Sequence, residues 1–565
     1  MAMAALGICG ALLPAQSVPH LTLTQPGGMP GLPVMTGIAK LTNGVQLTWD
    51  GPAGYYQVFQ NSNRLLNGSW LALGKATNLA RTVTITKLYS NAFFRVSGPV
   101  PKYAGFKICL TCHLNICRFE TNTAHASAFS NTNFVNGGGQ NNAACLPCHT
   151  VGYGLPTGFV SAAATPQLAG VQCENCHGPA ANHAASPDDP TVVPQVDLAA
   201  QVCGGCHSAS HTTYTNPPTF EEWSASAHAV VVPEVLQSMS SSTNNIRSCG
   251  VCHSGSARLA MLNGLNPAVT LTKDFNVPQT CAVCHDPHQT NAYPVQLRNP
   301  VSSTNNFELT SADTASVMAF TNKYNANTNI NLCAQCHNDR GAAWTDTARP
   351  PHHSLQYNML LATVGELAPF FPPYQAAHAG LPASAAISVS GTFYLTNQCV
   401  ACHMQSVAAS GGAPSHSFTV VTNICANCHD ASQLPSLPLT AYAPGLSNQI
   451  AGLIVSLNQW AATKAPAVLK TNGVAWEYPT ADGLAWQTNS SGALIGWTQS
   501  EQTLPAFNGP AAAFQSSLTN YPGVLKARFN LYLVLNDGSL GAHNWLYSIF
   551  LLDSAQYFIQ QELNK

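Results

Sequence analysis

Residues 173–177 have the sequence Cys173-Glu-Asn-Cys-His177, and the pattern Cys-x-x-Cys-His occurs nine times in this chain. The 565 residues include 20 cysteines and 20 histidines. At these abundances, chance would produce about 0.02 copies of the pattern. Two thiols at this spacing can add to the two vinyl groups of one haem, and the next residue can then give its imidazole to the iron. The sequence therefore predicts nine covalently bound haem c groups.

We number the motifs 1 to 9 in chain order. The cysteines predicted to hold the haems are Cys109, Cys112, Cys145, Cys148, Cys173, Cys176, Cys203, Cys206, Cys249, Cys252, Cys281, Cys284, Cys333, Cys336, Cys399, Cys402, Cys425 and Cys428. The predicted proximal iron ligands are His113, His149, His177, His207, His253, His285, His337, His403 and His429. A zinc site needs paired motifs without an obligatory histidine, and a dithiol enzyme needs a single motif, so neither explains the set.

Two cysteines, Cys9 and Cys117, lie outside the motifs. An unpaired cysteine is most often a small buried hydrophobic residue, which is the simplest interpretation of both. A disulfide between them is the alternative, and it would be lost if residue 9 belongs to a processed leader.

Eleven histidines lie outside the motifs, and ten of them, all except His20, are candidate distal ligands: His125, His183, His211, His228, His288, His352, His353, His378, His416 and His543. If the adjacent His352 and His353 count once, there is one candidate for each predicted haem. An iron with two imidazole ligands has no open position for a substrate, so it passes electrons instead of catalysing bond chemistry.

The ligand at one iron remains open between two assignments. His543 is either a distal ligand or a structural histidine near the start of a helix. In the second case, His352 and His353 could serve two different irons.

Some candidate distal ligands lie so close in sequence to one motif that they are expected to bind the haem of another motif. His288 lies three residues after His285, on the same side of that haem, so it is expected to bind the iron of a neighbouring haem. The same argument applies to His211, four residues after His207. The segments Thr-Ala-His125-Ala and Ser-Ala-His228-Ala resemble each other and are expected to be short helical ligand-bearing elements.

Several segments around the motifs resemble a known superfamily: Tyr103-Ala-Gly, Thr123-Ala-His125-Ala, Cys173-Glu-Asn-Cys-His-Gly-Pro, Trp223-Ser-Ala-Ser-Ala-His228, Cys281-Ala-Val-Cys-His-Asp-Pro-His288 and Arg349-Pro-Pro-His-His-Ser-Leu-Gln356. Residues 103–430 resemble the multihaem cytochromes that include the tetrahaem partner of hydroxylamine oxidoreductase and the octahaem reductases. The resemblance implies that the non-motif histidines are distal ligands. Residues 530–544 are similar to the end of octahaem and pentahaem reductases, where a histidine near long packed helices can bind iron.

The chain outside the motifs divides into three segments. Residues 1–18 are apolar and small, typical of a signal-peptide remnant or a short arm. Residues 19–98 contain five short β-type runs between Gly, Pro and Asn, which predict a small fibronectin-III-like sandwich, either an assembly module or a structural cap. Residues 440–565 predict a helical domain packed on the haem core, with apolar periodicity near 450–460, 524–535 and 545–563.

The motif region, residues 99–432, leaves roughly 36 residues for each haem, too few for ordinary hydrophobic cores. We therefore expect mostly loops and short helices wrapped on a stacked haem chain.

Composition bounds the function. Charged residues make up 8% of the chain and the net charge is -2, which argues against nucleic acid or an anionic membrane as a partner. No run of about 20 apolar residues predicts a transmembrane helix. Because haem c is attached outside the cytoplasm, the protein is expected to be exported, to the cell surface or exterior or otherwise to the periplasm.

Two classes of function fit these features. The favoured one is an electron carrier that serves redox partner proteins or extracellular acceptors, and whose neutral surface would ease assembly into a filament. The alternative is a multihaem reductase of nitrogen or sulfur compounds with one open haem. That alternative is weakened because no Cys-x-x-Cys-Lys variant occurs and no haem-crosslinking tyrosine can be identified.

Overall fold

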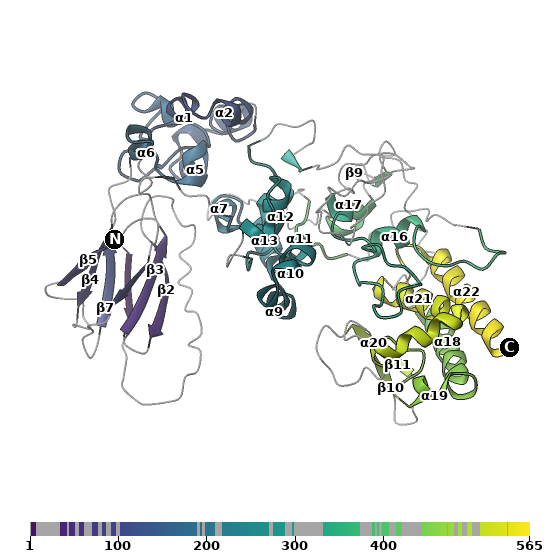
Figure 1. The fold of residues 1–565 in the computed structure, drawn as a ribbon. Helices are drawn as coiled ribbons and strands as arrows, with labels where there is room; N and C mark the ends of the chain where they lie inside the picture. Colours follow the sequence, from purple (N-terminus) through teal and green to yellow (C-terminus); the bar gives the residue numbers. More distant parts are fainter. Residues whose placement is uncertain are drawn as a thin grey trace. The chain divides into compact units, whose positions relative to one another are not determined.

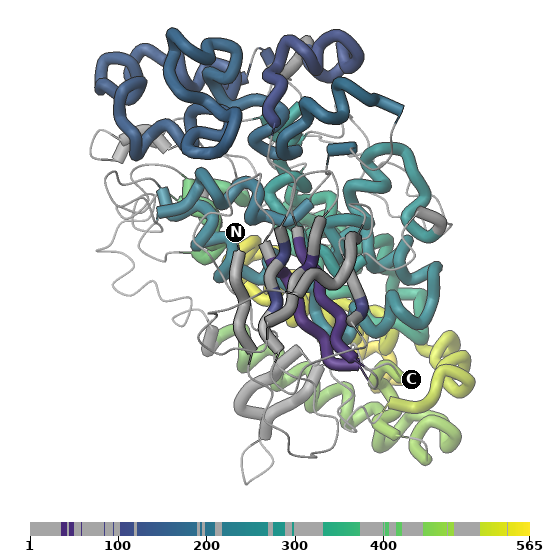
Figure 2. The backbone as a smooth tube through the Cα atoms, turned by 90° about the vertical axis from the view of Figure 1, so that its left-hand side faces the viewer, coloured from purple at the N-terminus to yellow at the C-terminus, as the bar shows by residue number. Residues whose placement is uncertain are grey.

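The structure is a computed structural model, which describes residues 2–6, 34–41, 44–50, 56–61, 71–76, 82–85, 92–97, 102–121, 123–188, 193–194, 198–209, 217–270, 275–288, 296–298, 332–372, 387–389, 392–394, 398–405, 414–420, 443–471, 473–479, 484–488, 494–499, 509–539 and 541–565. The chain forms two compact units. Unit 1 comprises Met1–Ala225, Thr280–Leu297 and Val407–Ala413, and unit 2 comprises Ser226–Gln279, Arg298–Ser406 and Pro414–Lys565. Figures 1 and 2 show the chain from two directions.

The N-terminal part of unit 1 consists of two antiparallel sheets. One has the order β1-β7-β4-β5, with strands Ala2–Leu6, Ala92–Ser97, Tyr56–Asn61 and Leu71–Ala76. The other has the order β2-β3-β6, with strands Val34–Leu41, Gly44–Asp50 and Thr82–Ile85. Residues 7–33, which include Cys9 and His20, lie outside the described residues.

Alternation along the strands explains the core of this part. Val45, Leu47 and Trp49 occupy every second position of β3, so all three point to one face. They form one buried cluster with Val58 of β4 and with Phe94 and Val96 of β7. Side chains from the two sheets therefore share one core. The five predicted β-type runs are confirmed as strands, whereas β1 and β2 were not predicted.

The motif-bearing part of unit 1 is built from short elements, as expected. Its helices are α1 Phe106–Leu110, α2 Leu114–Glu120, α3 Thr132–Asn136, η1 Gly139–Asn141, α4 Leu146–His149, η2 Pro166–Leu168, α5 Cys173–His177, α6 Ala181–Ala185, α7 Gln201–Gly204, α8 Thr219–Ser224 and α14 Cys281–Cys284. A small cluster of Phe129, Leu146, Val151, Phe159 and Leu168 is buried among them.

Unit 2 also begins with short elements. They are η4 Ala227–Ala229, α9 Pro233–Ser241, α10 Thr243–Ser248, α11 Gly250–His253, α12 Gly255–Leu262, α13 Pro267–Thr270, α16 Gln356–Leu361 and α17 Gln398–His403, with a small hairpin of β8 Ile387–Val389 and β9 Thr392–Tyr394. The backbone forms a turn at His125 and a short 3-10 helix, η4, at His228.

Three long helices form the C-terminal part of unit 2, and Figure 1 shows them in green to yellow. They are α18 Ala443–Thr463, α21 Pro522–Asn536 and α22 Trp545–Leu563, which confirms the three predicted helical stretches. Between them lie α19 Ala467–Lys470, α20 Ala512–Gln515, η10 Ser516–Asn520 and a hairpin of β10 Leu484–Thr488 and β11 Leu494–Gln499, which the sequence pattern did not predict. Among the described residues, no helix is long and apolar enough to cross a membrane.

The largest hydrophobic core of the described residues lies among these helices. Ile450, Leu453, Leu457 and Trp460 of α18 are all buried at helical spacing. Nearly every side chain of α21 is buried, so this helix runs through the centre of the core. Leu355, which directly precedes α16, and Met359, which lies in α16, belong to the same cluster. The helical core is therefore joined to the segment that carries His352 and His353.

A tight turn connects α21 to α22. Gly538 has φ 69° and Gly541 has φ 88°, backbone conformations that glycine adopts without a side-chain clash. The Asn544 side chain then caps α22 by accepting a hydrogen bond from the Tyr547 backbone N–H at 3.2 Å. This turn carries Asp537 and His543.

Candidate haem-binding sites

The motifs fold locally in the way that haem attachment requires. In motifs 1, 4 and 5 the histidine N–H donates to the carbonyl of the first cysteine, at 2.9 Å for His113, 2.9 Å for His207 and 3.0 Å for His253. The same bond is made by His285 and His337 at 2.9 Å. Each of these bonds closes one helical turn, which gathers both thiols and the imidazole into a single short element. Motif 9, with Cys425, Cys428 and His429, lies outside the described residues.

In unit 1, three predicted proximal histidines each lie beside a histidine from another segment. The ring centroids of His113 and His183 are 6.4 Å apart. Those of His207 and His125 are 6.1 Å apart. Those of His177 and His288 are 5.9 Å apart, so His288 lies beside the histidine of motif 3 and not that of its own motif 6.

In unit 2, three further predicted proximal histidines have such neighbours. The centroid separation is 6.2 Å between His337 and His228 and 6.4 Å between His403 and His543. His253 has two neighbours, His352 at 6.2 Å and His353 at 6.5 Å.

These separations match what two imidazoles on opposite sides of one metal ion require. A metal–imidazole bond of about 2.0 Å on each side gives ring centroids roughly 6.3 Å apart. By contrast, the rings of His352 and His353 stack at 4.2 Å, which is too close for the two to bind one iron from opposite sides. The six pairs with a motif histidine therefore fit the iron of a haem held between the two rings.

Hydrogen bonds to the other ring nitrogen orient several of these imidazoles. The Nδ1 atoms of His149 and His403 face backbone carbonyl oxygens at 2.8 Å and 3.0 Å, which assigns the proton to Nδ1 and leaves Nε2 for a metal. The Nδ1 of His352 lies 2.9 Å from Ser354 Oγ. Because Ser354 donates its own proton to the Asn338 carbonyl at 2.8 Å, its oxygen accepts from His352.

Burial keeps three of the paired histidines neutral. Burial and, more weakly, the neighbouring His337 lower the pKa of His228 to about 4. Burial and, among others, His353 lower the pKa of His253 to about 4 and that of His352 to about 2. A neutral imidazole is the form that binds a metal, so these side chains are ready to act as ligands at neutral pH.

Cysteine side chains that lie close together show which motifs are neighbours within each unit. In unit 1, Cys203 contacts Cys281 and Cys206 contacts Cys148, so motif 4 adjoins motifs 6 and 2. In unit 2, Cys252 contacts Cys336 and Cys333 contacts Cys399, so motif 7 adjoins motifs 5 and 8. Sequence order did not predict these neighbours.

Two buried polar side chains near motifs 5 and 7 have atoms without a hydrogen-bond partner among the described residues. Arg258 is 3% exposed and its Nη1 is unsatisfied, and Gln335 is 1% exposed with both amide atoms unsatisfied. Leaving a buried cation without an acceptor is costly. The carboxylates that a haem brings would supply acceptors, so these residues also fit a bound haem.

A buried carboxylate anchors motif 3, and sequence reasoning missed its role. Glu174 lies between the two cysteines of the motif and accepts hydrogen bonds from the N–H groups of Ala104, Gly105 and Ala180, at 2.7–3.1 Å. Burial raises the pKa of Glu174, against the lowering effect of these bonds. Gly105 is needed at this approach, because it has φ 81° and a Cβ there would lie 2.9 Å from the Gln167 carbonyl oxygen.

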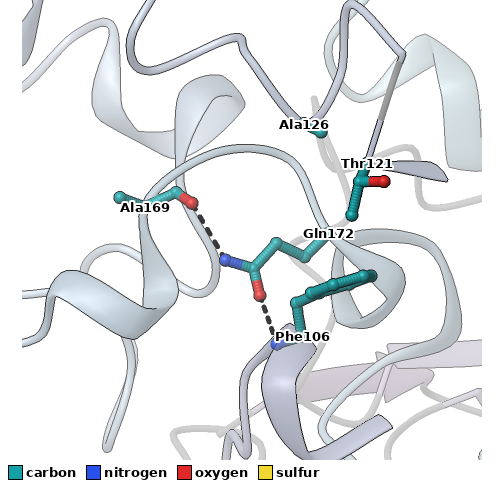
Figure 3. A pocket seen from close by; sticks show the side chains of 5 residues that line it. All are labelled: Phe106, Thr121, Ala126, Ala169 and Gln172. Carbon is teal, nitrogen blue, oxygen red and sulfur yellow. Dashed lines mark hydrogen bonds between the residues drawn. The ribbon is translucent and has the colours of Figure 1, made fainter. Parts of the chain in front are cut away.

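A pocket of about 270 Å³ lies beside motifs 1 and 3, lined by Phe106, Thr121, Ala126, Ala169 and Gln172. Figure 3 shows the Gln172 amide bridging two of its walls, accepting from the Phe106 N–H at 2.6 Å and donating to the Ala169 carbonyl at 2.9 Å. Ala126 follows His125, and Gln172 precedes Cys173. The pocket therefore belongs to the motif region.

Two further predicted site residues lie beside phenylalanine rings. The ring of His149 stacks on Phe134 at 4.0 Å, and His416 lies 6.1 Å from Phe418. His211 and His378 lie outside the described residues. Cys117 is buried, but its predicted alternative partner Cys9 is also outside them, so the disulfide stays a prediction.

Comparison with known proteins agrees with the motif geometry. The family described as cytochrome c554 and c-prime matches residues 108–178, which contain motifs 1, 2 and 3. Over these residues, the chain has the sequence of a multihaem c-type cytochrome. This match supports the prediction that the chain binds haem c covalently and transfers electrons. No curated protein matches the chain significantly.

Two solved structures are similar to this cytochrome. The outer cell wall cytochrome OcwA is 16% identical, with 81% of this chain and 100% of that chain covered and a TM-score of 0.43. The undecahaem cytochrome from the S-layer of Carboxydothermus ferrireducens is 19% identical, with 83% of this chain and 70% of that chain covered and a TM-score of 0.46.

Proposed function

We propose that this cytochrome carries nine haems, each with two histidine ligands, and that its function is electron transfer without substrate chemistry. The observation that carries the proposal is the set of histidine pairs with centroid separations near 6.2 Å. The proposed pairs, motif histidine first, are His113 with His183, His177 with His288, His207 with His125, His253 with His352, His337 with His228, and His403 with His543. For motifs 2, 6 and 9, the candidate distal ligands are His211, His353, His378 and His416.

When bound, each haem supplies a one-electron couple at its iron. The protein's own residues would leave no open coordination position at that iron. Two imidazoles would bind each iron, and hydrogen bonds at Nδ1, such as those of His403 and His352, fix the ring orientation. A site of this kind excludes substrate from the iron.

The thiol contacts support an order of electron transfer within each unit. Motif 4 adjoins motifs 2 and 6, and motif 7 adjoins motifs 5 and 8. We therefore propose the sequences 2–4–6 in unit 1 and 5–7–8 in unit 2, with the haems of motifs 4 and 7 as the central members.

We also propose how the remaining parts serve this function. Residues 19–98 would form a fibronectin-III-like sandwich that attaches or caps the molecule, supported by the core shared between the two sheets. Residues 99–432 would form the nonahaem domain, and 440–565 a domain packed on it. Residues 1–18 would be a signal-peptide remnant or arm; within this segment, Ala2–Leu6 pairs with β7.

The proposed setting is outside the cytoplasm, at the cell surface or exterior or otherwise in the periplasm. Covalent haem attachment and the low content of charged residues, 8%, support it. Redox partner proteins or extracellular acceptors would take the electrons, and copies could assemble into a conducting filament. Electron microscopy of the native secreted protein tests the last point: filaments would support it, and single particles at every concentration would refute it.

Spectroscopy tests the closed-site proposal against a reductase with one open haem. Electron paramagnetic resonance (EPR) of the oxidised protein should show only low-spin signals, and cyanide or nitrite should leave its spectrum unchanged. A high-spin component that disappears on adding cyanide would identify an open haem and favour the reductase.

A further inference from the structure

The ring of His543 has a carboxylate as its hydrogen-bond partner. Asp537 Oδ1 lies 2.7 Å from His543 Nδ1, and the Asp537 side chain is only 1% exposed. A buried carboxylate at this distance accepts the Nδ1 proton in a charge-assisted bond. The Nε2 of His543 is thereby left as the ring nitrogen available to a metal.

The position of this carboxylate is fixed by the turn between α21 and α22. The Ser539 hydroxyl bonds to Asp537 Oδ2, and the same hydroxyl accepts the His543 backbone N–H at 3.2 Å. The Gln356 amide donates to the Asp537 carbonyl at 3.4 Å. Side chain and main chain of Asp537 are therefore both restrained.

Two other histidines of the same unit have neutral ring partners. His403, which faces His543, has the Phe418 carbonyl as its Nδ1 acceptor at 3.0 Å. His352 has a serine hydroxyl at 2.9 Å. A carboxylate makes an imidazole a stronger electron donor than a carbonyl or hydroxyl does, because it draws the Nδ1 proton further from the ring.

We propose that Asp537 is a positioning residue that lowers the reduction potential of the haem held by motif 8. This inference rests on the proposed ligand role of His543. A more strongly donating imidazole and a nearby negative charge both stabilise the ferric iron over the ferrous iron. No atom is transferred: one electron enters or leaves the iron, and the Nδ1 proton stays in the bond between His543 and Asp537.

The lowered potential has a consequence for electron flow in unit 2. Motif 8 adjoins motif 7 through Cys399 and Cys333. An electron that reaches motif 8 would therefore pass on to motif 7 more readily than it returns. Asp537 thus makes the motif 8 haem an entry point of the 5–7–8 sequence.

The test uses the full holoprotein and five variants. Asp537→Asn keeps the shape of the side chain but removes its charge. In a potentiometric titration, the component that belongs to one haem should then move to higher potential. One low-spin EPR component should change as well. Ser539→Ala keeps the carboxylate but removes the hydroxyl donor at Oδ2, which makes the carboxylate a stronger acceptor, so the same component of the titration should move to lower potential. Asp537→Glu retains a carboxylate and should lie nearer the wild type than Asp537→Asn.

Asp346→Asn is the charge-matched control, because Asp346 is in the same unit and pairs with Arg349 at 2.8 Å instead of a histidine. The proposal is overturned if Asp537→Asn and Ser539→Ala titrate like this control while mass spectrometry confirms full haem content. His543→Gly separates this outcome from a failure of the ligand assignment. It should produce one high-spin haem, and a spectrum that remains fully low-spin would refute the ligand role itself.

Discussion

His352 and His353 are both candidates for the second iron ligand of the motif 5 haem. Both rings lie beside His253, at 6.2 Å and 6.5 Å, so distance alone does not separate them. For His352, a chain of hydrogen bonds through Ser354 to the Asn338 carbonyl assigns the Nδ1 proton. Such support from the second nitrogen typically accompanies a metal-bound histidine.

Substitution of each histidine tests this assignment. We expect His352→Ala to convert the motif 5 haem to a high-spin form, because its second ligand is lost. His353→Ala, the matched control, should leave that haem low-spin. EPR of the oxidised variants distinguishes them, and the reverse outcome would transfer the ligand role to His353.

Arg258 is a second residue whose role depends on the cofactor. Its guanidinium is buried, with Nη1 unsatisfied among the described residues, so a haem carboxylate is its expected partner. Arg258→Met should then cost the holoprotein about 1.5–3 kcal/mol, the usual value of a hydrogen bond to a charged group. Urea unfolding followed by the Soret band measures this. The exposed Arg349→Met provides the control, since surface ion pairs contribute about 0–1 kcal/mol. An unchanged midpoint for Arg258→Met would mean that no anion binds there.

At the scale of elements, a buried polar network joins the C-terminal helices to the segment before the histidine pair. Arg528 of α21 is fully buried and donates to the Trp476 and Thr347 carbonyls at 3.0 Å and 2.9 Å and to Gln515 Oε1 at 3.0 Å. Its guanidinium also lies 3.8 Å from the centre of the Tyr478 ring. The bond to Thr347 reaches from the helical core to the chain just ahead of His352.

Removing this guanidinium should loosen the attachment. Arg528→Met leaves several buried carbonyl acceptors without donors, so we expect a loss of at least about 3 kcal/mol in the unfolding of the C-terminal helices. Far-UV circular dichroism during urea unfolding measures it. Lys470→Met, at an exposed site, should change stability by less than about 0.5 kcal/mol. Equal midpoints for the two variants would contradict a stabilising role for the network.

The elements also show what local patterns predict. Helices α18, α21 and α22 were predicted because each carries an apolar face or core over several turns. Strand β1 was not, because its sequence Ala-Met-Ala-Ala-Leu has little β preference and it becomes a strand by pairing with β7.

At the scale of the whole molecule, the cofactors change the charge. The chain alone has a net charge of -2 and an isoelectric point near 6.8. Each ferric haem with two propionates adds one net negative charge, so nine haems add about nine. We expect the oxidised holoprotein to focus well below pH 6.8, and the reduced protein lower still, because each reduced iron loses a positive charge. Isoelectric focusing in both redox states tests this, and a focusing point near 6.8 would argue against nine haems.

The covalent haem sites were predictable from sequence because each depends on five consecutive residues within one helical turn. The list of candidate distal histidines was also predictable, because counting needs no geometry. Only the tertiary structure decides which histidines meet. His403 and His543 are far apart in the sequence, and α21, α22 and their turn bring them together. Asp537, Glu174 and Arg258 were missed for the same reason. Their roles depend on burial and on where the folded chain places each side chain, which no local spacing records.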